Sequence, residues 1–180
     1  MPPLSDGEIA IRARTLEWLL LDVDGVFTDG KLLYGAAGEE HKVFDVRDGL
    51  GTKLVQKAGI KVGILSGRGN EALKTRANEL GLDVLIQDRS DKAAAFSEFL
   101  AEVETTPERV AYMGDDLLDL PVMRRCVLAF APADAVAEVR ERVHRVLSCR
   151  GGHGAVRELC ELLLRARGDW DRLIAPFLGD

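Results

Sequence analysis

The stretch of sequence that decides the fold is Leu19-Leu20-Leu21-Asp22-Val23-Asp24-Gly25. Within it, Leu19–Val23 is a short apolar run that ends in acidic residues, which predicts a buried strand with polar side chains at its end. Later runs of similar character predict strands of the same sheet, buried on both faces: Lys61–Leu65, Val84–Ile86, Val110–Met113 and Val127–Phe130.

Helical patterns lie between these runs. Asn70 is a candidate cap of a helix that continues through Leu80, with Gly81 as its stop. Ser90 is a candidate cap of the next helix. The alternation of strands and helices predicts an α/β fold around a doubly wound, mostly parallel sheet. Ligands of such folds bind at the carboxyl ends of the strands. Apolar stripes at helical spacing support two of the helices: Phe96, Phe99, Leu100 and Val103, then Val156, Leu159, Cys160 and Leu163.

One segment departs from this alternation. Lys31–Tyr34 and Glu39–Val46 flank a glycine-containing turn at residues 35–38, which predicts a β-hairpin over 31–46 that projects from the sheet. No repeat, low-complexity tract or linker divides the chain, so we expect one domain over residues 1–180 with a C-terminal tail from about 150 to 180. The predicted elements fill the intervals from Asp22 to Ser66 and from Ser66 to Lys92, so we expect no inserted cap domain.

The composition excludes several functional classes. An apolar fraction of 47% in 180 residues is enough for a sizeable core, and no apolar run is long enough to span a membrane. Met1–Arg14 lacks the pattern of a signal peptide, so we expect a cytoplasmic protein. A net charge of -6 argues against nucleic-acid binding, which needs a surplus of Lys and Arg.

The cysteines do not form a recognisable site. Cys126, Cys149 and Cys160 are an odd number in apolar or helical stretches, which favours reduced thiols over disulfides. Cys149 and His153 lack a second pair at zinc-like spacing, so we do not expect a zinc site.

Polar side chains of complementary chemistry follow four of the predicted strands. Since the carboxyl ends of parallel strands meet at one edge of a sheet, we expect these side chains to lie together. They are, in chain order, Asp22 and Asp24, then Ser66, then Lys92, and finally Asp115, Asp116 and Asp119.

This set suits phosphoryl transfer, which depends on positioning and on neutralisation of negative charge. Asp22 is the candidate nucleophile and Asp24 the candidate general acid and base. Lys92 would offset the repulsion between Asp22 and the phosphate, and Ser66 would bind a phosphate oxygen. Carboxylates favour Mg²⁺, which we expect Asp22 and Asp115 to hold together with the backbone carbonyl of Asp24. Whether Asp116 or Asp119 contacts the metal or orients Lys92 is left open.

The chain resembles the haloacid dehalogenase superfamily, whose four motifs match Asp22-x-Asp24, Ser66, Lys92 and Gly114-Asp115-Asp116-x-x-Asp119. Within it, the sequence is similar to the 3-deoxy-D-manno-octulosonate 8-phosphate phosphatase family, which acts in lipopolysaccharide biosynthesis. The stretches that carry this likeness span about Leu16–Ala166: residues 22–30, Arg47-Asp48-Gly49-x-Gly51, Ser66-Gly67-Arg68, residues 114–123 and Gly151-Gly152-x-Gly154-Ala155-Val156-Arg157-Glu158.

The resemblance implies a capless Rossmann-like domain, a magnesium cofactor and a homotetramer. In that family, hairpins assemble the tetramer and the C-terminal segment reaches toward a neighbour's site. Residues 31–46 and Arg150–Arg157 are therefore the interface candidates. An open site would bind its substrate poorly, and a partner subunit could close it.

A sugar-acid substrate requires cations for its carboxylate. Arg68, which follows Ser66 and Gly67, is the first candidate, and the others are Arg47, Arg150 and Arg157. His153 stands where the family usually has Arg or Lys, which weakens the expected anion contact of the tail. Relatives acting on nine-carbon keto-sugar phosphates tend to have Glu at the position of Arg68, so Arg68 favours the eight-carbon acid.

Three alternatives remain open at this point. A phospho-accepting receiver domain would carry its acceptor aspartate at the end of the third strand and its acidic pair on adjacent residues. An idle domain that acts as a scaffold would not need the full set of reactive groups. A phosphomutase would need a lid that excludes water from the aspartyl phosphate.

Overall fold

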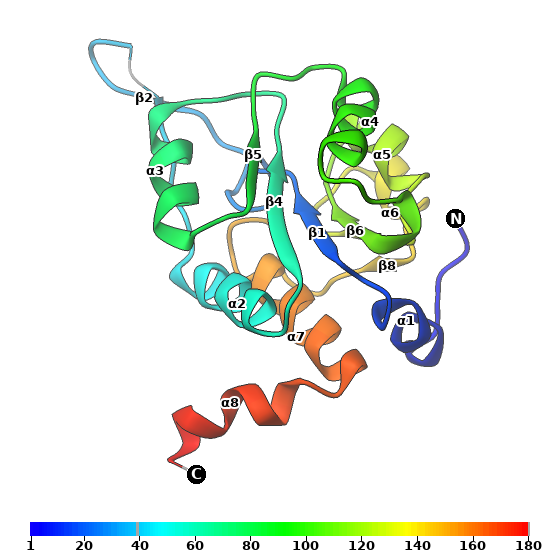
Figure 1. Cartoon of the computed structure of the whole chain (residues 1–180). Coiled ribbons are helices and arrows are strands. Elements are labelled where there is room, and N and C mark those ends of the chain that lie inside the picture. The colour runs from blue at the N-terminus through cyan, green and yellow to red at the C-terminus, as the bar shows by residue number, and fades with distance from the viewer. Residues whose placement is uncertain (39, 180) are drawn as a thin grey trace.

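Six parallel strands form the central sheet, in the order β5-β4-β1-β6-β7-β8 (Figure 1). The structure is a computed structural model and describes residues 1–38 and 40–179. The α/β class, the Rossmann-like doubly wound sheet and the separate hairpin are as the sequence predicts. The strands are β1 (Trp18–Leu21), β4 (Lys61–Leu65), β5 (Val84–Ile86), β6 (Val110–Met113), β7 (Leu128–Ala131) and β8 (Arg145–Val146).

Helices cover both faces of this sheet. In β1, Leu19 and Leu21 point into one buried core and Trp18 and Leu20 into the other, as the two-residue period of a strand requires. The first core is closed by α1 (Asp6–Ala13), α2 (Val46–Lys57), α3 (Glu71–Leu80) and α7 (Ala155–Arg167), with α8 (Trp170–Leu178) packed on α7. The second is closed by α4 (Lys92–Glu102), α5 (Leu120–Met123) and α6 (Ala137–Arg140).

Local capping explains where two of the helices begin. The side chain of Asn70 accepts a hydrogen bond from the backbone N–H of Leu73, and Gly81 ends α3 in the left-handed conformation, both as predicted. The prediction of Ser90 as the cap of α4 is wrong. Asp91 caps this helix instead, because its carboxylate accepts from the N–H of Ala94. A charged acceptor at this position also complements the helix dipole.

The hairpin is shorter than the sequence suggests. It consists of β2 (Leu33–Tyr34) and β3 (Glu40–His41), which pair in antiparallel fashion. The predicted second strand started at Glu39, which lies outside the described residues, and its predicted end at Val46 is wrong. Val46 begins α2, because Asp45 caps that helix by accepting a hydrogen bond from the N–H of Arg47.

Several strand limits also differ from expectation. β1 ends at Leu21 rather than Val23, and β7 lies one residue later than predicted. β5 is only partly buried because it is an edge strand. The other edge strand, β8, has two residues, too few for a periodic signal. Two short 3₁₀ helices complete the fold, η1 (Pro107–Arg109) and η2 (Leu117–Asp119).

The chain reverses its direction across the sheet at β1. It passes from β1 to β4 and β5 on one side and then returns to β6 on the other side. The N–H of Asp22 donates to the carbonyl of Met113 at 3.0 Å, so the exits of β1 and β6 lie together. Such a switch point is where open α/β sheets bind ligands. Residues 1–38 and 40–179 contain no separate cap domain over this edge.

The described helices contain no segment with both the length and the hydrophobicity needed to cross a bilayer.

Candidate active site

A cavity of about 260 Å³ opens at the carboxyl edge of the sheet. A larger groove of about 560 Å³ lies between α1 and α7, but none of the predicted site residues lines it. The smaller cavity is therefore the candidate site. Its lining gathers residues that follow four strands: Asp22, Asp24, Gly30, Ser66, Gly67, Arg68, Lys92, Asp115, Asp116, Leu118 and Asp119.

Lys92 is a buried cation between two carboxylates. It is the first residue of α4, and its Nζ lies 2.9 Å from Asp22 Oδ1 and 2.6 Å from Asp119 Oδ1. Burial alone would lower the pKa of Lys92, but the two adjacent carboxylates raise it above its usual value. Lys92 therefore stays charged beside Asp22.

Asp119 has both of its oxygens occupied. Oδ1 accepts from Lys92 and from the hydroxyl of Tyr112 at 2.7 Å, while Oδ2 accepts from the backbone N–H groups of Asp115 and Asp116. This arrangement suits a residue that orients Lys92 and shapes the loop after β6. No sequence pattern marks Tyr112, because a tyrosine in a buried strand has the same pattern as a core residue.

Asp22 and Asp115 are carboxylates with too little positive charge around them. Burial, followed by the charge of Asp119, raises the pKa of Asp22 to about 7. Burial, followed by the charge of Asp22, raises the pKa of Asp115 to about 8. In the part of the chain that the structure describes, Asp115 Oδ1 is buried without a hydrogen-bond partner. Both observations indicate that a cation belongs at this position.

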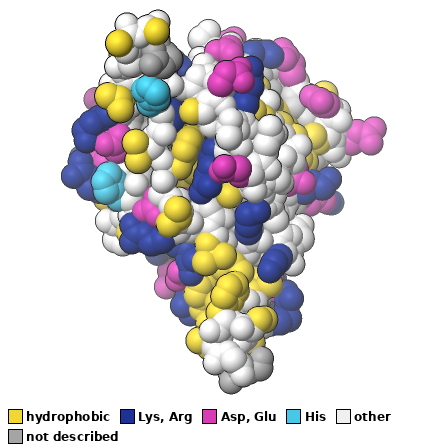
Figure 2. All heavy atoms as spheres, turned by 90° about the vertical axis from the view of Figure 1, so that its left-hand side faces the viewer, with side chains coloured by type: hydrophobic (Ala, Val, Ile, Leu, Met, Phe, Trp, Pro, Cys, Tyr) yellow, Lys and Arg dark blue, Asp and Glu magenta, His cyan; other side chains and the backbone are white. Residues whose placement is uncertain are grey.

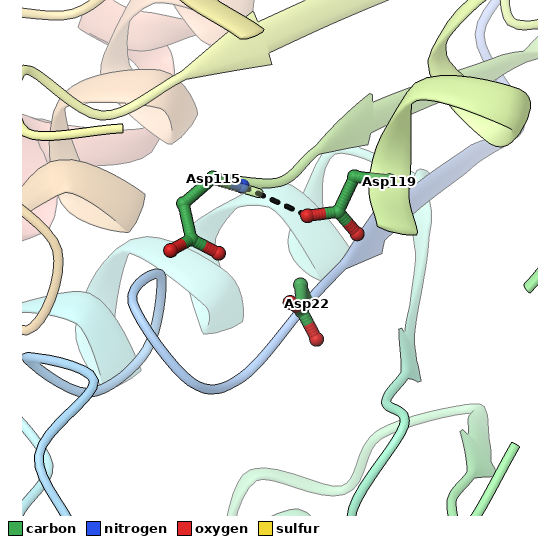
Figure 3. A group of neighbouring side chains, drawn as sticks. All are labelled: Asp22, Asp115 and Asp119. Carbon is green, nitrogen blue, oxygen red and sulfur yellow. Dashed lines mark hydrogen bonds between the residues drawn. The ribbon is translucent and has the colours of Figure 1, made fainter. Parts of the chain in front are cut away.

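The carboxylate set fits a divalent metal ion. Asp22, Asp115 and Asp119 each offer an oxygen, and the three atoms lie within 4.8 Å of one another (Figure 3). Since Asp119 already accepts four hydrogen bonds, the oxygens of Asp22 and Asp115 are the better ligands. Hard oxygen donors of this kind favour Mg²⁺. Gly25 makes room for the site, because a Cβ on it would lie 2.0 Å from Asp115 Oδ2.

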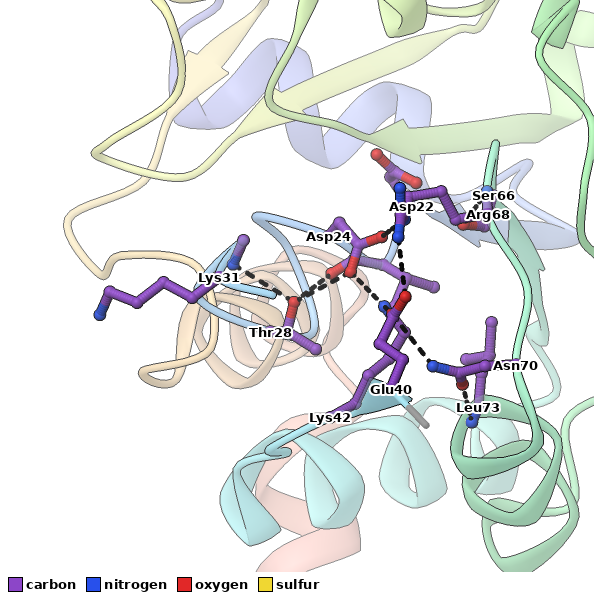
Figure 4. A network of polar contacts seen from close by, with 12 residues as sticks. Asp22, Asp24, Thr28, Lys31, Glu40, Lys42, Ser66, Arg68, Asn70 and Leu73 are labelled. Carbon is purple, nitrogen blue, oxygen red and sulfur yellow. Dashed lines mark hydrogen bonds and ion pairs between the residues drawn. The ribbon is translucent and has the colours of Figure 1, made fainter. Parts of the chain in front are cut away.

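Asp24 is held by two side chains that the sequence did not single out as site residues. Its Oδ1 accepts from Lys42 Nζ at 2.5 Å and from Thr28 Oγ1 at 3.4 Å (Figure 4). Lys42 comes from the segment after β3, so the base of the hairpin reaches the site. No motif marked it, because the contact depends on how the hairpin folds back over the sheet.

Ser66 and Arg68 lie where the sequence predicts them. Ser66 is buried, and its hydroxyl accepts from the N–H of Arg68 at 3.2 Å. The Arg68 side chain is about half exposed at the mouth of the cavity. Its guanidinium donates to Glu40 at 2.7 Å and to the hydroxyl of Tyr34 at 3.3 Å. The hairpin therefore supplies two hydrogen-bond acceptors of the Arg68 guanidinium.

The other three predicted arginines do not line the cavity within this chain. Arg47 pairs with Asp45, Arg150 with Asp134 and Arg157 with Glu161. All three side chains are at least partly exposed, and their predicted contact with substrate stays a prediction. His153 lies in the same tail, where one ring nitrogen is 2.8 Å from the carbonyl of Gly151.

The glycine motif of the tail packs on the loop that follows Asp24. A Cβ on Gly151 would lie 1.8 Å from the carbonyl oxygen of Gly25, and one on Gly152 would lie 2.5 Å from the backbone nitrogen of Asp29. The N–H of Gly152 also donates to the carbonyl of Val26 at 2.9 Å. This close backbone contact explains the glycines without a substrate contact.

A second motif is explained by helix packing. A Cβ on Gly51 in α2 would lie 3.1 Å from the Cα of Arg157 in α7, so Gly51 allows these helices to approach closely. Asp48 Oδ1 accepts from the N–H of Arg157 at 2.7 Å, at the start of α7.

The cysteines are free thiols, as predicted, and Cys126 and Cys160 are buried.

Comparisons with known proteins place these features in context. No protein-family model matches the chain. It is 46% identical over 165 residues to the 3-deoxy-D-manno-octulosonate 8-phosphate phosphatase KdsC of Yersinia pestis, covering 92% of this chain and 88% of that protein. The enzyme of the same name from Escherichia coli K12 is 44% identical over 169 residues, covering 94% and 89%.

A solved structure is similar over nearly the whole chain. It is the 3-deoxy-D-manno-octulosonate 8-phosphate phosphatase of Moraxella catarrhalis, in complex with a magnesium ion, a phosphate ion and a KDO molecule. The two chains are 35% identical with a TM-score of 0.92, covering 95% of this chain and 98% of the other.

Proposed function

This chain belongs to the 3-deoxy-D-manno-octulosonate 8-phosphate phosphatase family of the haloacid dehalogenase superfamily, and we propose that it hydrolyses that sugar phosphate to the free sugar acid and phosphate. The observation that carries the proposal is the buried Asp22, which contacts Lys92 and has a carboxylate oxygen within 4.8 Å of one from Asp115. Within the described residues, Asp115 Oδ1 has no hydrogen-bond partner. Metal-assisted phosphoryl transfer requires a nucleophile, a fixed positive charge and a carboxylate that is free to bind the metal.

Mg²⁺ is the cofactor that this carboxylate set suits. Asp22 and Asp115 would hold it through their side chains, and the backbone carbonyl of Asp24 would add a ligand. When bound, the ion neutralises charge on the two carboxylates and on the phosphate.

The residues of the chain then have the following roles. The Asp22 carboxylate attacks phosphorus, and the bond between phosphorus and the sugar oxygen breaks as Asp24 donates a proton to that oxygen. Lys92 offsets the negative charge that gathers between Asp22 and the phosphate, while Ser66 and the N–H of Gly67 bind phosphate oxygens. Asp24 next takes a proton from water, which attacks the aspartyl phosphate, releases inorganic phosphate and restores Asp22. Asp116 and Asp119 support the loop and Lys92.

Arg68 is the residue that we propose for the substrate carboxylate. It is half exposed beside Ser66, and a guanidinium binds carboxylates through two parallel hydrogen bonds. Arg47, Arg150 and Arg157 are weaker candidates, because each is paired outside the cavity of its own chain.

We also propose that the chain assembles as a homotetramer, through the hairpin region 31–46 and the tail. Apolar side chains of this region are exposed: Leu32, Leu33, Tyr34 and Val43. Figure 2 displays hydrophobic side chains at both ends of this face, at the hairpin and over α8. Sedimentation equilibrium would test the assembly, and a concentration-independent monomer would refute it. The cytoplasmic location stays a prediction, which cell fractionation would test.

The function is tested by measuring phosphate release from eight- and nine-carbon keto-sugar acid phosphates, with Mg²⁺ or with EDTA. We expect preference for the eight-carbon substrate, dependence on Mg²⁺, and no turnover by Asp22→Asn. Equal activity across the panel would refute only the assignment of the eight-carbon substrate. Undiminished release by Asp22→Asn would refute the mechanism, and a single labelling event without turnover would indicate a receiver domain.

A further inference from the structure

Lys42 is a buried lysine at the base of the hairpin, and no motif of the chain includes it. Its side chain is 2% exposed, and its ammonium lies 2.5 Å from Asp24 Oδ1 and 3.0 Å from Glu40 Oε1 (Figure 4). Burying an ammonium is costly unless it is paired. Its two carboxylate partners satisfy that requirement, and one of them is Asp24.

The two oxygens of Asp24 have different surroundings. Oδ1 contacts Lys42, at the base of the hairpin, and Thr28, in the loop after β1. Oδ2 has Arg68 Nε at 3.8 Å, at the mouth of the cavity that Asp24 lines. Anchoring Oδ1 therefore fixes the rotation of the carboxylate and leaves Oδ2 toward the substrate.

Lys42 is itself fixed by a second layer. Glu40 Oε1 accepts from Lys42 and from Asn70 Nδ2 at 3.0 Å, while Oε2 accepts from Arg68. Asn70 is also the cap of α3, so this layer ends on a helix terminus. Through the hairpin residues, the orientation of Asp24 therefore depends on the position of helix α3.

We propose that Lys42 is a positioning residue that holds Asp24 Oδ1, so that Oδ2 is presented to the leaving oxygen of the substrate. This inference rests on the proposed function, because it assumes that Asp24 protonates the leaving group. The expected effect is large, since misplacing a catalytic group by about 1 Å costs about 100-fold in rate.

The test uses the leaving group as a reporter. A sugar alkoxide needs a proton in order to leave, whereas p-nitrophenolate leaves without one. The value of kcat/KM covers steps up to formation of the aspartyl phosphate, so the later use of Asp24 as a base does not enter it. The ratio of kcat/KM for the sugar phosphate to kcat/KM for p-nitrophenyl phosphate therefore isolates proton donation. It is also independent of the fraction of enzyme that is folded.

Lys42→Met should lower this ratio about 100-fold. Lys42→Arg, which keeps a cation, should restore part of the loss. Lys74→Met is the matched control, because Lys74 is an exposed lysine paired with Glu71 on α3, and it should leave the ratio unchanged. If Lys42→Met gives no active protein, Lys42→Gln replaces it. This variant should lower the ratio less, because the amide N–H groups of glutamine can still donate to Asp24.

Asp24→Asn separates this inference from the function on which it rests. If Asp24→Asn lowers the ratio and the Lys42 variants do not, Lys42 has no positioning role although Asp24 is the acid. If Asp24→Asn reduces kcat/KM for both substrates equally, the proposed role of Asp24 is wrong and the positioning role is overturned with it. If Lys42→Met lowers kcat/KM for both substrates by the same factor, Lys42 has a structural role only.

Discussion

The ammonium of Lys92 lies 2.9 Å from Asp22 Oδ1, on a side chain that is only 3% exposed. This contact joins the start of α4 to the exit of β1, and Asp119 fixes the same ammonium from the other side. Removing one member of a buried charged cluster leaves the others uncompensated.

Lys92→Met should therefore lower both stability and activity. We expect a loss of about 3 kcal/mol in the free energy of unfolding, because two buried carboxylates lose their cation. Urea unfolding without metal measures the loss, and phosphate release should fall to background. The control is again Lys74→Met, which should change stability by less than about 0.5 kcal/mol. A Lys92→Met protein as stable as the control would contradict the buried cluster.

Stability of the metal-free protein should decrease as the pH rises from about 6.5 to about 8.5. The pKa values of Asp22 and Asp115 are raised to about 7 and about 8 in the folded chain, from an ordinary value of 3.8. Over this range the folded state holds more protons than the unfolded state, so deprotonation costs folding free energy. Their stabilising contribution is complete only below about pH 4. Thermal unfolding in EDTA, at several pH values, measures the trend.

Two comparisons check the origin of this pH dependence. Mg²⁺ should reduce the slope, because the ion replaces the protons, and Asp115→Asn should flatten it without metal. The range above pH 6.5 is chosen because burial lowers the pKa of His144 to about 4, and this group has the opposite effect at lower pH. An unchanged slope in Asp115→Asn would show that other groups cause the trend.

The sequence was enough to predict which side chains gather at the carboxyl edge of the sheet. Asp22, Asp24, Ser66, Lys92 and Asp115 each follow a strand exit, and parallel strands bring such exits together whatever the exact strand limits. What remained hidden depends on tertiary contacts. Tyr112 has the pattern of a core residue, and Lys42 reaches Asp24 only through the fold of the hairpin. Strand β8 has only two residues, which is too short for a sequence pattern. Ser90 and Asp91 are both good capping residues, and pattern does not decide between them.

Gly151→Ala should disturb the site from outside the cavity. The new Cβ would collide with the carbonyl of Gly25, so the loop after Asp24 must shift. We expect a loss of about 1–3 kcal/mol in stability and a fall of about 100-fold in kcat for phosphate release.

Gly7→Ala provides the matched control for this substitution. Gly7 lies in α1, and a Cβ there would contact nothing within 4 Å, so alanine should stabilise the chain by about 0.5–1 kcal/mol. Thermal unfolding and phosphate release of both variants decide the matter. Equal behaviour of the two alanine variants would contradict the packing of the tail on the loop.

Arg68→Ala should weaken binding of the sugar acid more than catalysis. Loss of a charge-assisted hydrogen bond costs about 1.5–3 kcal/mol, which predicts a rise in KM of about 10- to 100-fold for the carboxylate-bearing substrate. A sugar phosphate without a carboxylate should be much less affected. Arg172→Ala, which removes an exposed arginine paired with Asp169, serves as control. Identical losses on both substrates would argue against carboxylate recognition by Arg68.

The contact between Gly25 and Gly151 also limits which substitutions this sequence can accept during evolution. A Cβ on Gly151 would collide with the carbonyl of Gly25, and a Cβ on Gly25 would collide with the side chain of Asp115. Since both positions already hold the smallest residue, a mutation at one cannot be rescued by a smaller residue at the other. The nucleophile loop and the distant tail must therefore keep their glycines together over evolutionary time. If codons 25 and 151 are randomised jointly and variants are screened for phosphate release, glycine should return at both positions.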